Sequence, residues 1–364
     1  MKRRDVLFGG GSLAAVAAGG IYVVREQMGS ASDYDAVTAA TRAPLPQVPE
    51  MRDLIRYATL APNGHNAQPW LFRTSKNRID ILPDFARRTP VVDPDDHHLF
   101  VSLGCAAENL ALASAARGRP GSSAFDPTNG SIAFDFGAGR PVEPALFDAI
   151  PRRQSTRAEF DGRLVSGADL QMLATASAVP GVDCIIITDR PQIDRVRDLV
   201  VSGNSNQMAD PAFMCELRSW LRFNPRQAAE TGDGLYSVAS GNPAMPRWIG
   251  RRALDWFVTA KSENDKYAAQ LRSSSGIAVF VAAKEDREHW VLVGHACQRF
   301  ALQATALGLK HAFVNQPVEV PSLRPDLAAL VGLPGRRPDT VMRFGYGPDL
   351  PFSSRRAARI LTRQ

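Results

Sequence analysis

Apolar positions recur at helical spacing along most of the chain after residue 50. From Met51 to Ala61 an apolar residue returns every three or four positions, which predicts a helix with one buried face. Pro62 and Gly64 then end that helix. The same periodicity predicts further helices over 99–117, 167–178, 192–208, 211–222, 287–307 and 323–331.

Other segments alternate or run apolar in the manner of strands. Alternation of apolar and polar residues over 78–82 and 131–137 predicts half-buried strands. The continuous apolar runs at 182–189, 276–283 and 340–347 predict buried or central strands.

Two of the predicted helical segments resemble each other. Residues 104–118 and 294–308 both run from Gly to Gly, and six of their fifteen positions are identical. Their small residues fall on one face, where two helix backbones can approach closely. Ala-rich helices can look alike by chance, but similar flanking elements favour an internal duplication. We expect two halves, about 51–150 and 151–360, that pack across these helices into one compact domain spanning 51–360.

A long segment interrupts the second half. Residues 209–275 are rich in Gly, Asn and Pro and only weakly periodic. Such an insertion is often a lid or a binding loop.

The N-terminus has the layout of a targeting segment. Lys2, Arg3 and Arg4 precede an uncharged stretch from Val6 to Val24, as in a twin-arginine export signal. A membrane anchor of marginal length is the alternative. We therefore expect residues 1–31 to be a signal or anchor, residues 32–50 to be a Pro/Ala/Thr linker, and the protein to be exported to the periplasm. Whether the signal is cleaved or retained as an anchor stays open. The twin-arginine export machinery moves proteins that are already folded. Its use therefore favours a protein that binds a cofactor in the cytoplasm before export.

Composition adds little to this picture. The 364 residues are 45% hydrophobic and 22% charged, as expected for a globular protein, with a net charge of +6. No basic run is interleaved with aromatics, so nucleic acid is not an expected partner. The four cysteines are far apart and form no C-x-x-C pair, which argues against a disulfide framework.

Three segments could bind a ligand. The turn "APNGHNAQPW" (61–70) carries several side-chain amides, which both donate and accept hydrogen bonds. In "PRRQSTRAEF" (151–160), arginines surround Ser155, a pattern that suits a phosphate monoester but also a solvated basic turn. A C-terminal strand is followed by Arg355 and Arg356, which could equally be a basic tail.

Together and in this order, these segments resemble the FMN-dependent nitroreductase superfamily. The amide turn is similar to that family's A-P-S-x-x-N-x-Q-P-W turn, with Asn63 in place of Ser, and "RRQSTR" resembles its phosphate motif. "RFGYGP" and the later arginines match its C-terminal pattern. The segments 95–118 and 149–157 point to a branch in which two nitroreductase-like halves are fused. The resemblance covers roughly residues 50–360.

The resemblance implies an α+β fold, with a central, mostly antiparallel sheet flanked by helices, and an FMN cofactor. Asn63, Gly64 and Asn66 would face the flavin ring, and the loop at Asn315 and Gln316 would lie near its N5. The residues implied for the FMN phosphate are Arg152, Arg153, Ser155, Arg157, Arg355 and Arg356. The flavin carries out the electron transfer, so no catalytic side chain is expected.

The implied function is electron transfer from an unknown donor to a small acceptor, such as a nitroaromatic or a quinone. The alternative is a non-catalytic protein that sequesters or stores FMN beneath a lid. Because NAD(P)H is a cytoplasmic reductant, an exported enzyme is expected to use another donor.

Two further expectations concern the number and kind of sites. Only the first half has the amide turn and only the second is preceded by the arginine motif, which predicts one FMN per chain and no need for a homodimer. "DPDDHH" (93–98) could hold a metal, but Asp is also a common helix cap, and we predict no metal site.

Overall fold

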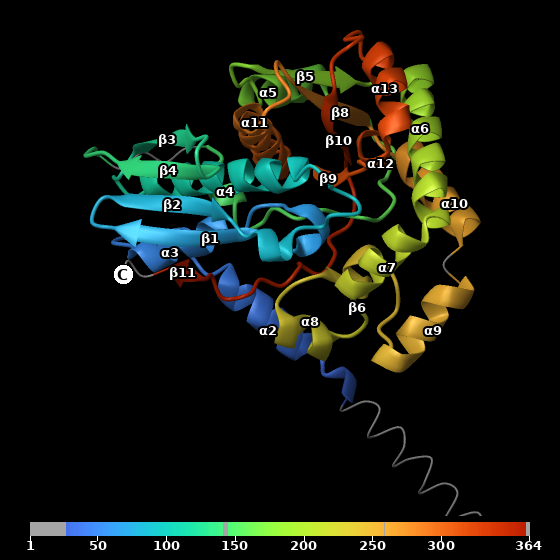
Figure 1. Ribbon diagram of the computed structural model, residues 1–364, viewed down its shortest axis with the longest axis horizontal. Helices are drawn as coiled ribbons and strands as arrows, with labels where there is room; N and C mark the ends of the chain where they lie inside the picture. The colour runs from blue at the N-terminus through green and yellow to red at the C-terminus, as the bar shows by residue number, and fades with distance from the viewer. Residues whose placement is uncertain (1–26, 141–144, 258, 362–364) are drawn as a thin grey trace, which may run out of the picture.

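The computed structural model describes residues 27–140, 145–257 and 259–361 (Figure 1). The helices of the first half are α2 (Ala31–Thr41), α3 (Met51–Ala58) and α4 (His97–Ala115). Those of the second half are α5 (Gly167–Ala176), α6 (Arg190–Ala209), α7 (Pro211–Trp220), α8 (Pro225–Thr231), α9 (Arg247–Phe257), α10 (Ala260–Arg272), α11 (Arg287–Ala306), α12 (Gln316–Glu319) and α13 (Arg324–Leu330). The predicted helices lie within a few residues of these bounds.

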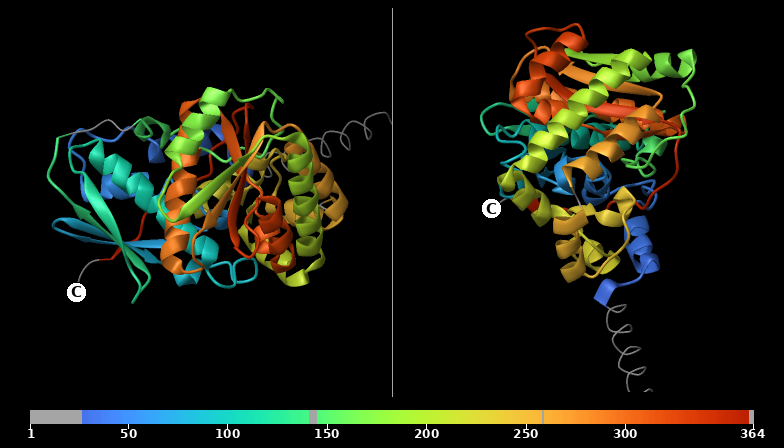
Figure 2. Two further views of the ribbon diagram at one scale, coloured as in Figure 1. Left: turned by 90° about the horizontal axis from the view of Figure 1, so that it is seen from above. Right: turned by 90° about the vertical axis from the view of Figure 1, so that its right-hand side faces the viewer.

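The described strands form two main sheets. The first has the order β11-β1-β2-β4-β3 and the second the order β5-β8-β10-β9. Their bounds are β1 (Trp70–Ser75), β2 (Arg78–Pro83), β3 (Gly121–Asp126), β4 (Ser131–Phe136), β5 (Val182–Ile187), β8 (Gly276–Ala282), β9 (Lys310–Phe313), β10 (Pro338–Gly345) and β11 (Ile360–Leu361). All pairs within these sheets are antiparallel except β1 with β11. The predicted α+β class is confirmed, although each half has its own sheet in place of one central sheet (Figure 2).

Helices α4 and α11 lie side by side between the two sheets (Figure 1). They are the helices whose sequences resemble each other, and glycine is required where they cross. A Cβ on Gly104 would lie 2.1 Å from the Val291 carbonyl oxygen, and one on Gly294 would lie 2.2 Å from that of Val101. The predicted close approach of the two backbones is therefore present, while the duplication stays a prediction.

The crossing also places two cysteines together. The Sγ atoms of Cys105 and Cys297 are 3.5 Å apart, and both side chains are buried. No disulfide forms between the four cysteines.

The second sheet is covered on both faces. Its central strands, β8 and β10, are buried along their whole length. On the face away from α11, Val279 and Val341 pack with Val196 and Val200 of α6 and with Leu271 of α10. Strand β5 lies at the edge of the sheet and is only partly buried, so the prediction of a central strand there was wrong.

Two segments are more ordered than their composition suggests. The region predicted as a linker contains α2, which Ser30 caps and which packs Tyr34 against Ala228 and Tyr236 of the second half of the chain. The insertion 209–275 is largely helical, with a short parallel pair of β6 (Leu221–Arg222) and β7 (Leu235–Tyr236). In both segments tertiary packing, which local composition does not reveal, decides the structure.

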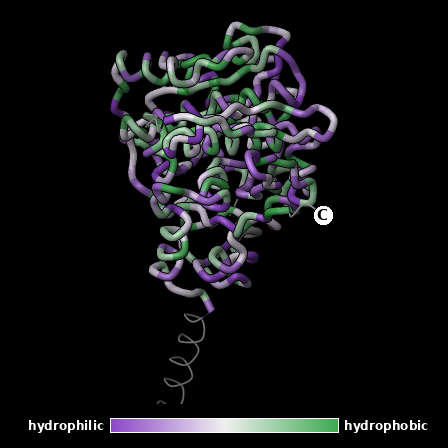
Figure 3. Tube along the Cα trace, turned by 90° about the vertical axis from the view of Figure 1, so that its left-hand side faces the viewer, coloured by the Kyte–Doolittle hydropathy of each residue, from purple (hydrophilic) through white to green (hydrophobic). Residues whose placement is uncertain are grey.

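Figure 3 shows hydrophobic and hydrophilic residues interspersed along the trace. None of the helices in the described ranges is both long and apolar enough to cross a membrane. Residues 1–31 were predicted to be a signal or anchor, and residues 1–26 of that segment lie outside the described ranges.

Candidate functional site

A cavity of about 280 Å³ lies between the two halves. Segments far apart in the sequence line it: the turn after α3, the arginine motif, the loop before α12 and the segment that precedes β11. Nine of the predicted site residues are in its wall, namely Asn63, Gly64, Asn66, Arg153, Ser155, Arg157, Asn315, Gln316 and Arg355. The fold thus brings together three segments that the sequence suggested separately.

The amide turn has a strained backbone held by its own side chains. His65, Asn66 and Gln68 all have positive φ, which is uncommon for residues other than glycine. The Asn63 side chain braces the turn: its Oδ1 accepts from the Gln68 backbone N–H at 2.7 Å and its Nδ2 donates to the Ala61 carbonyl at 3.2 Å. Strained positions of this kind persist only where the surroundings hold them, and they concentrate at functional sites.

Asn66 links three parts of the chain. Its Nδ2 donates to the carbonyls of Gly234 and Ser354, both at 3.1 Å, and its Oδ1 accepts from Arg355 Nη1 at 2.8 Å. The side-chain amides of Asn63 and Asn66 are therefore occupied by protein partners. They shape the cavity wall, and the sequence did not indicate this bracing role for them.

Arg153 is the most unusual residue of the wall. Its side chain is buried, with 3% of the residue exposed, and only Nη2 has a partner, the Leu60 carbonyl at 2.9 Å. Nε and Nη1 have no hydrogen-bond partner among the described residues. Burial lowers the pKa of this guanidinium to about 10. A buried donor left unpaired costs free energy, so the pair of open nitrogens points to an anionic ligand.

Other arginines add positive charge around the same end of the cavity. Arg355 is buried and hydrogen-bonded to the carbonyls of Thr59, Leu60 and Ala61. Arg42 also lines the cavity; burial and the nearby Arg153 lower its pKa to about 9. Within the part of the chain that the structure describes, neither of these two arginines, nor Arg153 or Arg157, forms an ion pair with a carboxylate.

Ser155 and Arg157 also line the cavity. Ser155 forms an isolated bridge with His311 of β9, which fixes the backbone of the arginine motif against the second sheet. The Arg157 side chain has no hydrogen bond within the described ranges, and burial lowers its pKa. Burial, with a smaller contribution from the positive charge of Arg157, lowers the pKa of His65 to about 4. His65 is therefore neutral at pH 7.

Two predicted residues lie outside the cavity wall. Arg152 is exposed, and its Nε donates to the Asp148 carbonyl at 3.0 Å, because the turn after Ile150 directs it away from the cavity. Arg356 contacts Asp84 at 3.3 Å and the carbonyls of Gln68 and Trp70. In the structure, both arginines bind other protein groups and do not face the cavity.

Asn315, Gln316 and Glu319 form another polar part of the wall, where Tyr267 lies near Gln316, Glu319 and Arg157. Asn315 Oδ1 accepts from the Val341 N–H at 2.9 Å, whereas the buried Gln316 Oε1 has no partner among the described residues. Glu319 lies in this part of the wall, where it accepts from Gln207 at 2.6 Å and where burial raises its pKa. Phe213 and Leu217 of α7 and Leu235 of the insertion add apolar surface.

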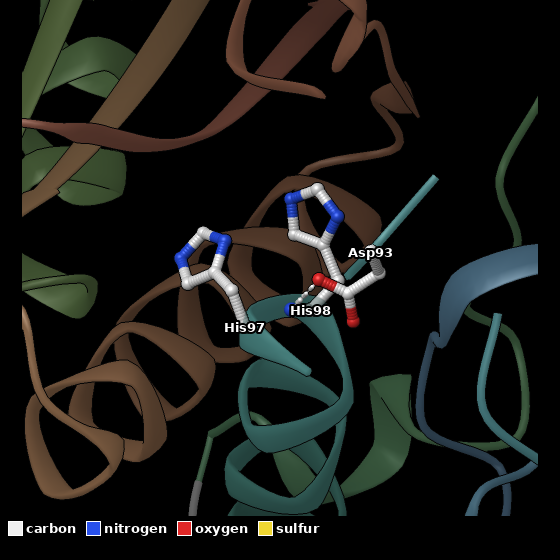
Figure 4. Close-up of side chains that lie close together, drawn as sticks. All are labelled: Asp93, His97 and His98. Atoms are coloured by element: carbon white, nitrogen blue, oxygen red, sulfur yellow. Dashed lines mark hydrogen bonds between the residues drawn. The ribbon is translucent and has the colours of Figure 1, made fainter. Parts of the chain in front are cut away.

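The sequence also suggested a metal site at 93–98, where Asp93, His97 and His98 lie close together (Figure 4). Their possible ligand atoms lie within 4.8 Å of one another. The Asp93 carboxylate, however, caps α4, since it accepts from the N–H groups of His98 and Leu99 at 3.0 Å. His97 Nε2 lies 2.7 Å from Asp339 Oδ1, so the imidazole already has a carboxylate partner. These contacts account for the cluster without an ion.

The arginine end of the cavity fits a phosphate monoester. Two unpartnered nitrogens on Arg153, the free guanidinium of Arg157 and the Ser155 hydroxyl group offer donors to a tetrahedral dianion. Sequence reasoning missed Arg42, which joins this end from the segment predicted as a linker. An isolated arginine in a segment of small residues carries no motif by which it could be recognised.

Comparisons with known proteins agree with the motifs. The "Putative NAD(P)H nitroreductase Rv3131" of Mycobacterium tuberculosis (strain ATCC 25618 / H37Rv) is 27% identical over 323 residues, covering 85% of this chain and 89% of that protein. The "Putative NAD(P)H nitroreductase acg" of the same strain is 24% identical over 316 residues, covering 82% and 90%. The chain is similar to these two proteins over most of its length. No family model matches it.

Solved nitroreductase structures show only a distant similarity. The FMN-dependent nitroreductase NfnB from Mycobacterium smegmatis in complex with NADPH is 14% identical with a TM-score of 0.37, covering 56% of this chain and 88% of that one. A nitroreductase with bound FMN from Bacteroides fragilis is 13% identical with a TM-score of 0.36, covering 56% and 88%. The predicted relation to nitroreductases rests on the two sequence relatives, and the fused branch and the export signal stay predictions.

Proposed function

We propose that the chain is an FMN-dependent oxidoreductase of the nitroreductase type, which transfers electrons from a donor to a small acceptor. The observation that supports this most is Arg153, a buried guanidinium with two open nitrogens in the wall of a cavity between the halves. An FMN phosphate would supply the missing acceptors. The relatives' names, which describe NAD(P)H nitroreductases, support the same class.

In this proposal the chain binds and orients FMN, and the bound FMN supplies the redox chemistry. Arg153, Ser155 and Arg157 hold the phosphate, with Arg355 and Arg42 adding positive charge behind them. The turn at Asn63, Gly64 and Asn66 shapes the wall beside the ring. The apolar side chains of Phe213 and Leu217 suit a flat acceptor such as a nitroaromatic or a quinone.

A second candidate function is FMN sequestration without turnover. The insertion 209–275 supports it, because Phe213, Leu217 and Leu235 from that segment line the cavity. A lid formed by this segment would protect a bound flavin from reductants and acceptors alike.

Reoxidation of the reduced flavin separates the two functions. The purified protein, loaded with FMN, is reduced anaerobically and then mixed with nitroaromatic or quinone acceptors, with free FMN as the control. The oxidoreductase proposal expects an acceptor to reoxidise the bound flavin faster than it reoxidises free FMN. A flavin that no donor reduces, dithionite included, would refute it and favour sequestration.

The proposed setting is the periplasm, reached through the twin-arginine export machinery, with the N-terminal segment either cleaved or kept as an anchor. In that setting NAD(P)H would not be the physiological donor, and a membrane quinol or a protein donor is expected. Reduction of the bound FMN by NADPH with a micromolar Michaelis constant would argue against this donor assignment.

A further inference from the structure

The first turns of α9 expose an unusual combination of side chains. Trp248 is 65% exposed and Ile249 is 37% exposed, although large apolar residues are usually covered. Arg247, Arg251 and Arg252 are exposed beside them. No hydrogen bond or ion pair joins these three arginines to any other described residue. The patch Arg247–Arg252 is therefore apolar and cationic at once.

The opposite side of α9 fixes the helix to the rest of the molecule. A Cβ on Gly250 would lie 2.3 Å from the Phe223 ring, and the Met245 N–H donates to the Phe223 carbonyl at 2.9 Å. The Asn224 side chain, which caps α8, also donates to the Met245 carbonyl at 3.1 Å. The patch thus faces outward from a helix whose other side is anchored.

The patch lies at the end of the molecule where the N-terminal segment joins it. Helix α8 packs on α2 through Ala228 and Tyr34, and Gly29 contacts Arg226. Two views show α2, α8 and α9 at the same end (Figures 1 and 2). The 26 residues that precede the described chain, among them the uncharged stretch 6–24, therefore connect at this end.

We propose that the exposed face of α9 docks on an anionic lipid bilayer. Tryptophan prefers the level of the lipid headgroups, and arginines close to an anionic surface are attracted to its phosphates. A helix that combines both lies in the plane of the interface. This inference rests on the proposed export only for its setting, and it does not depend on the flavin.

The charges nearby confine the interaction to α9. Asp33 and Asp35 on α2 and Glu230 on α8 are exposed at the same end, so the whole end is not basic. We therefore expect the contact to depend on Trp248 and on the three arginines, and not on a diffuse attraction of the molecule to negative charge.

Quenching of tryptophan fluorescence by brominated lipids tests the docking in the full chain. The vesicles contain phosphatidylethanolamine and phosphatidylglycerol at 3:1 with brominated acyl chains, and Trp248→Phe is compared with wild type. If Trp248 enters the interface, the wild-type emission is quenched and the variant loses that quenched component. Equal quenching of both proteins would mean that Trp248 does not enter the bilayer, which would overturn the proposal.

Charge reversal tests the arginines separately. Arg251→Glu with Arg252→Glu should raise the lipid concentration that half-quenches Trp248 by at least about twenty-fivefold, since the loss of each arginine contributes about fivefold. The matched control, Arg195→Glu with Arg140→Glu, reverses two exposed charges outside α9 and should leave that concentration unchanged. An equal effect of both pairs, or equal quenching in neutral phosphatidylcholine vesicles, would also overturn the proposal. Unchanged circular dichroism verifies that each variant folds.

Discussion

The guanidinium of Arg153 is buried, yet two of its three nitrogens have no partner among the described residues. Each buried unpaired donor lowers the stability of the folded protein by about 1–3 kcal/mol, and a bound anion that accepts from these nitrogens would remove this penalty. Arg152, its neighbour in the sequence, is exposed and has no such role. The two residues form a natural test and control.

Arg153→Ala should weaken FMN binding roughly ten- to a hundredfold, because charge-assisted hydrogen bonds contribute about 1.5–3 kcal/mol. Riboflavin, which lacks the phosphate, should bind wild type and variant alike. Fluorescence titration with both flavins measures this. Arg152→Ala is the control, and it should bind FMN as wild type does. If Arg153→Ala retained wild-type FMN affinity, the phosphate assignment would be wrong.

Most of the site residues that the sequence predicted line the cavity, but the sequence did not predict how they are used. Motif positions indicated Arg153, Ser155 and Arg157, because hydroxyl and guanidinium groups at close spacing are typical of phosphate binding. The roles of Asn66 and Arg152 depend on which way each side chain points. Asn66 bonds to Gly234, which is 168 positions away, and no local pattern encodes such a contact.

At the scale of elements, the packing of α4 on α11 positions the cavity. Gly104 and Gly294 permit a backbone contact that no other residue would allow, and Val101 and Cys105 beside it line the cavity. The sequence predicted both helices and their small-residue face. It did not predict that each half would form its own sheet, nor that the C-terminal β11 would join the sheet of the first half, because strand partners are chosen by tertiary contacts.

Gly104→Ala should destabilise the protein by about 1–3 kcal/mol or more, since a Cβ there would overlap the Val291 carbonyl oxygen and force the helices apart. Gly167→Ala is the control, because its Cβ would meet no atom within 4 Å and the residue lies in the first turn of a helix. Urea unfolding followed by circular dichroism gives both values. Equal stabilities of the two variants would contradict the packing described.

Helix α4 also begins at a buried pair that links it to β10. His97 Nε2 and Asp339 Oδ1 are 2.7 Å apart and almost fully buried. Burial raises the pKa of Asp339 to about 7 and lowers the pKa of His97 well below its usual 6.5. Folded Asp339 is therefore neutral below about pH 7, and His97 stays neutral to a lower pH than a free imidazole does.

This pair predicts a dependence of stability on pH. An unfolded Asp loses its proton near pH 4, whereas folded Asp339 keeps it until about pH 7. Its contribution to stability is thus complete below pH 4 and is lost as the pH rises to about 7, by roughly 4 kcal/mol at most. The unfolding free energy of wild type minus that of Asp339→Asn should therefore be larger at pH 5 than at pH 8. A difference that is constant or increases with pH would contradict the assignment.

At the scale of the whole molecule, segments from both halves of the chain line one cavity. The amide turn comes from the first half and the arginine motif leads the second, and both meet in the same cavity. In the sequence, no second copy of either motif occupies the equivalent place in the other half. The account therefore expects a single flavin, bound without help from a second chain.

The stoichiometry of FMN binding tests this claim most directly. Apo-protein is titrated with FMN by equilibrium dialysis, and the mass of the loaded species is measured by light scattering during size-exclusion chromatography. The account predicts one FMN per chain, with full occupancy retained in the monomer fraction. Two flavins per chain, no saturable binding, or flavin lost from monomers would contradict it.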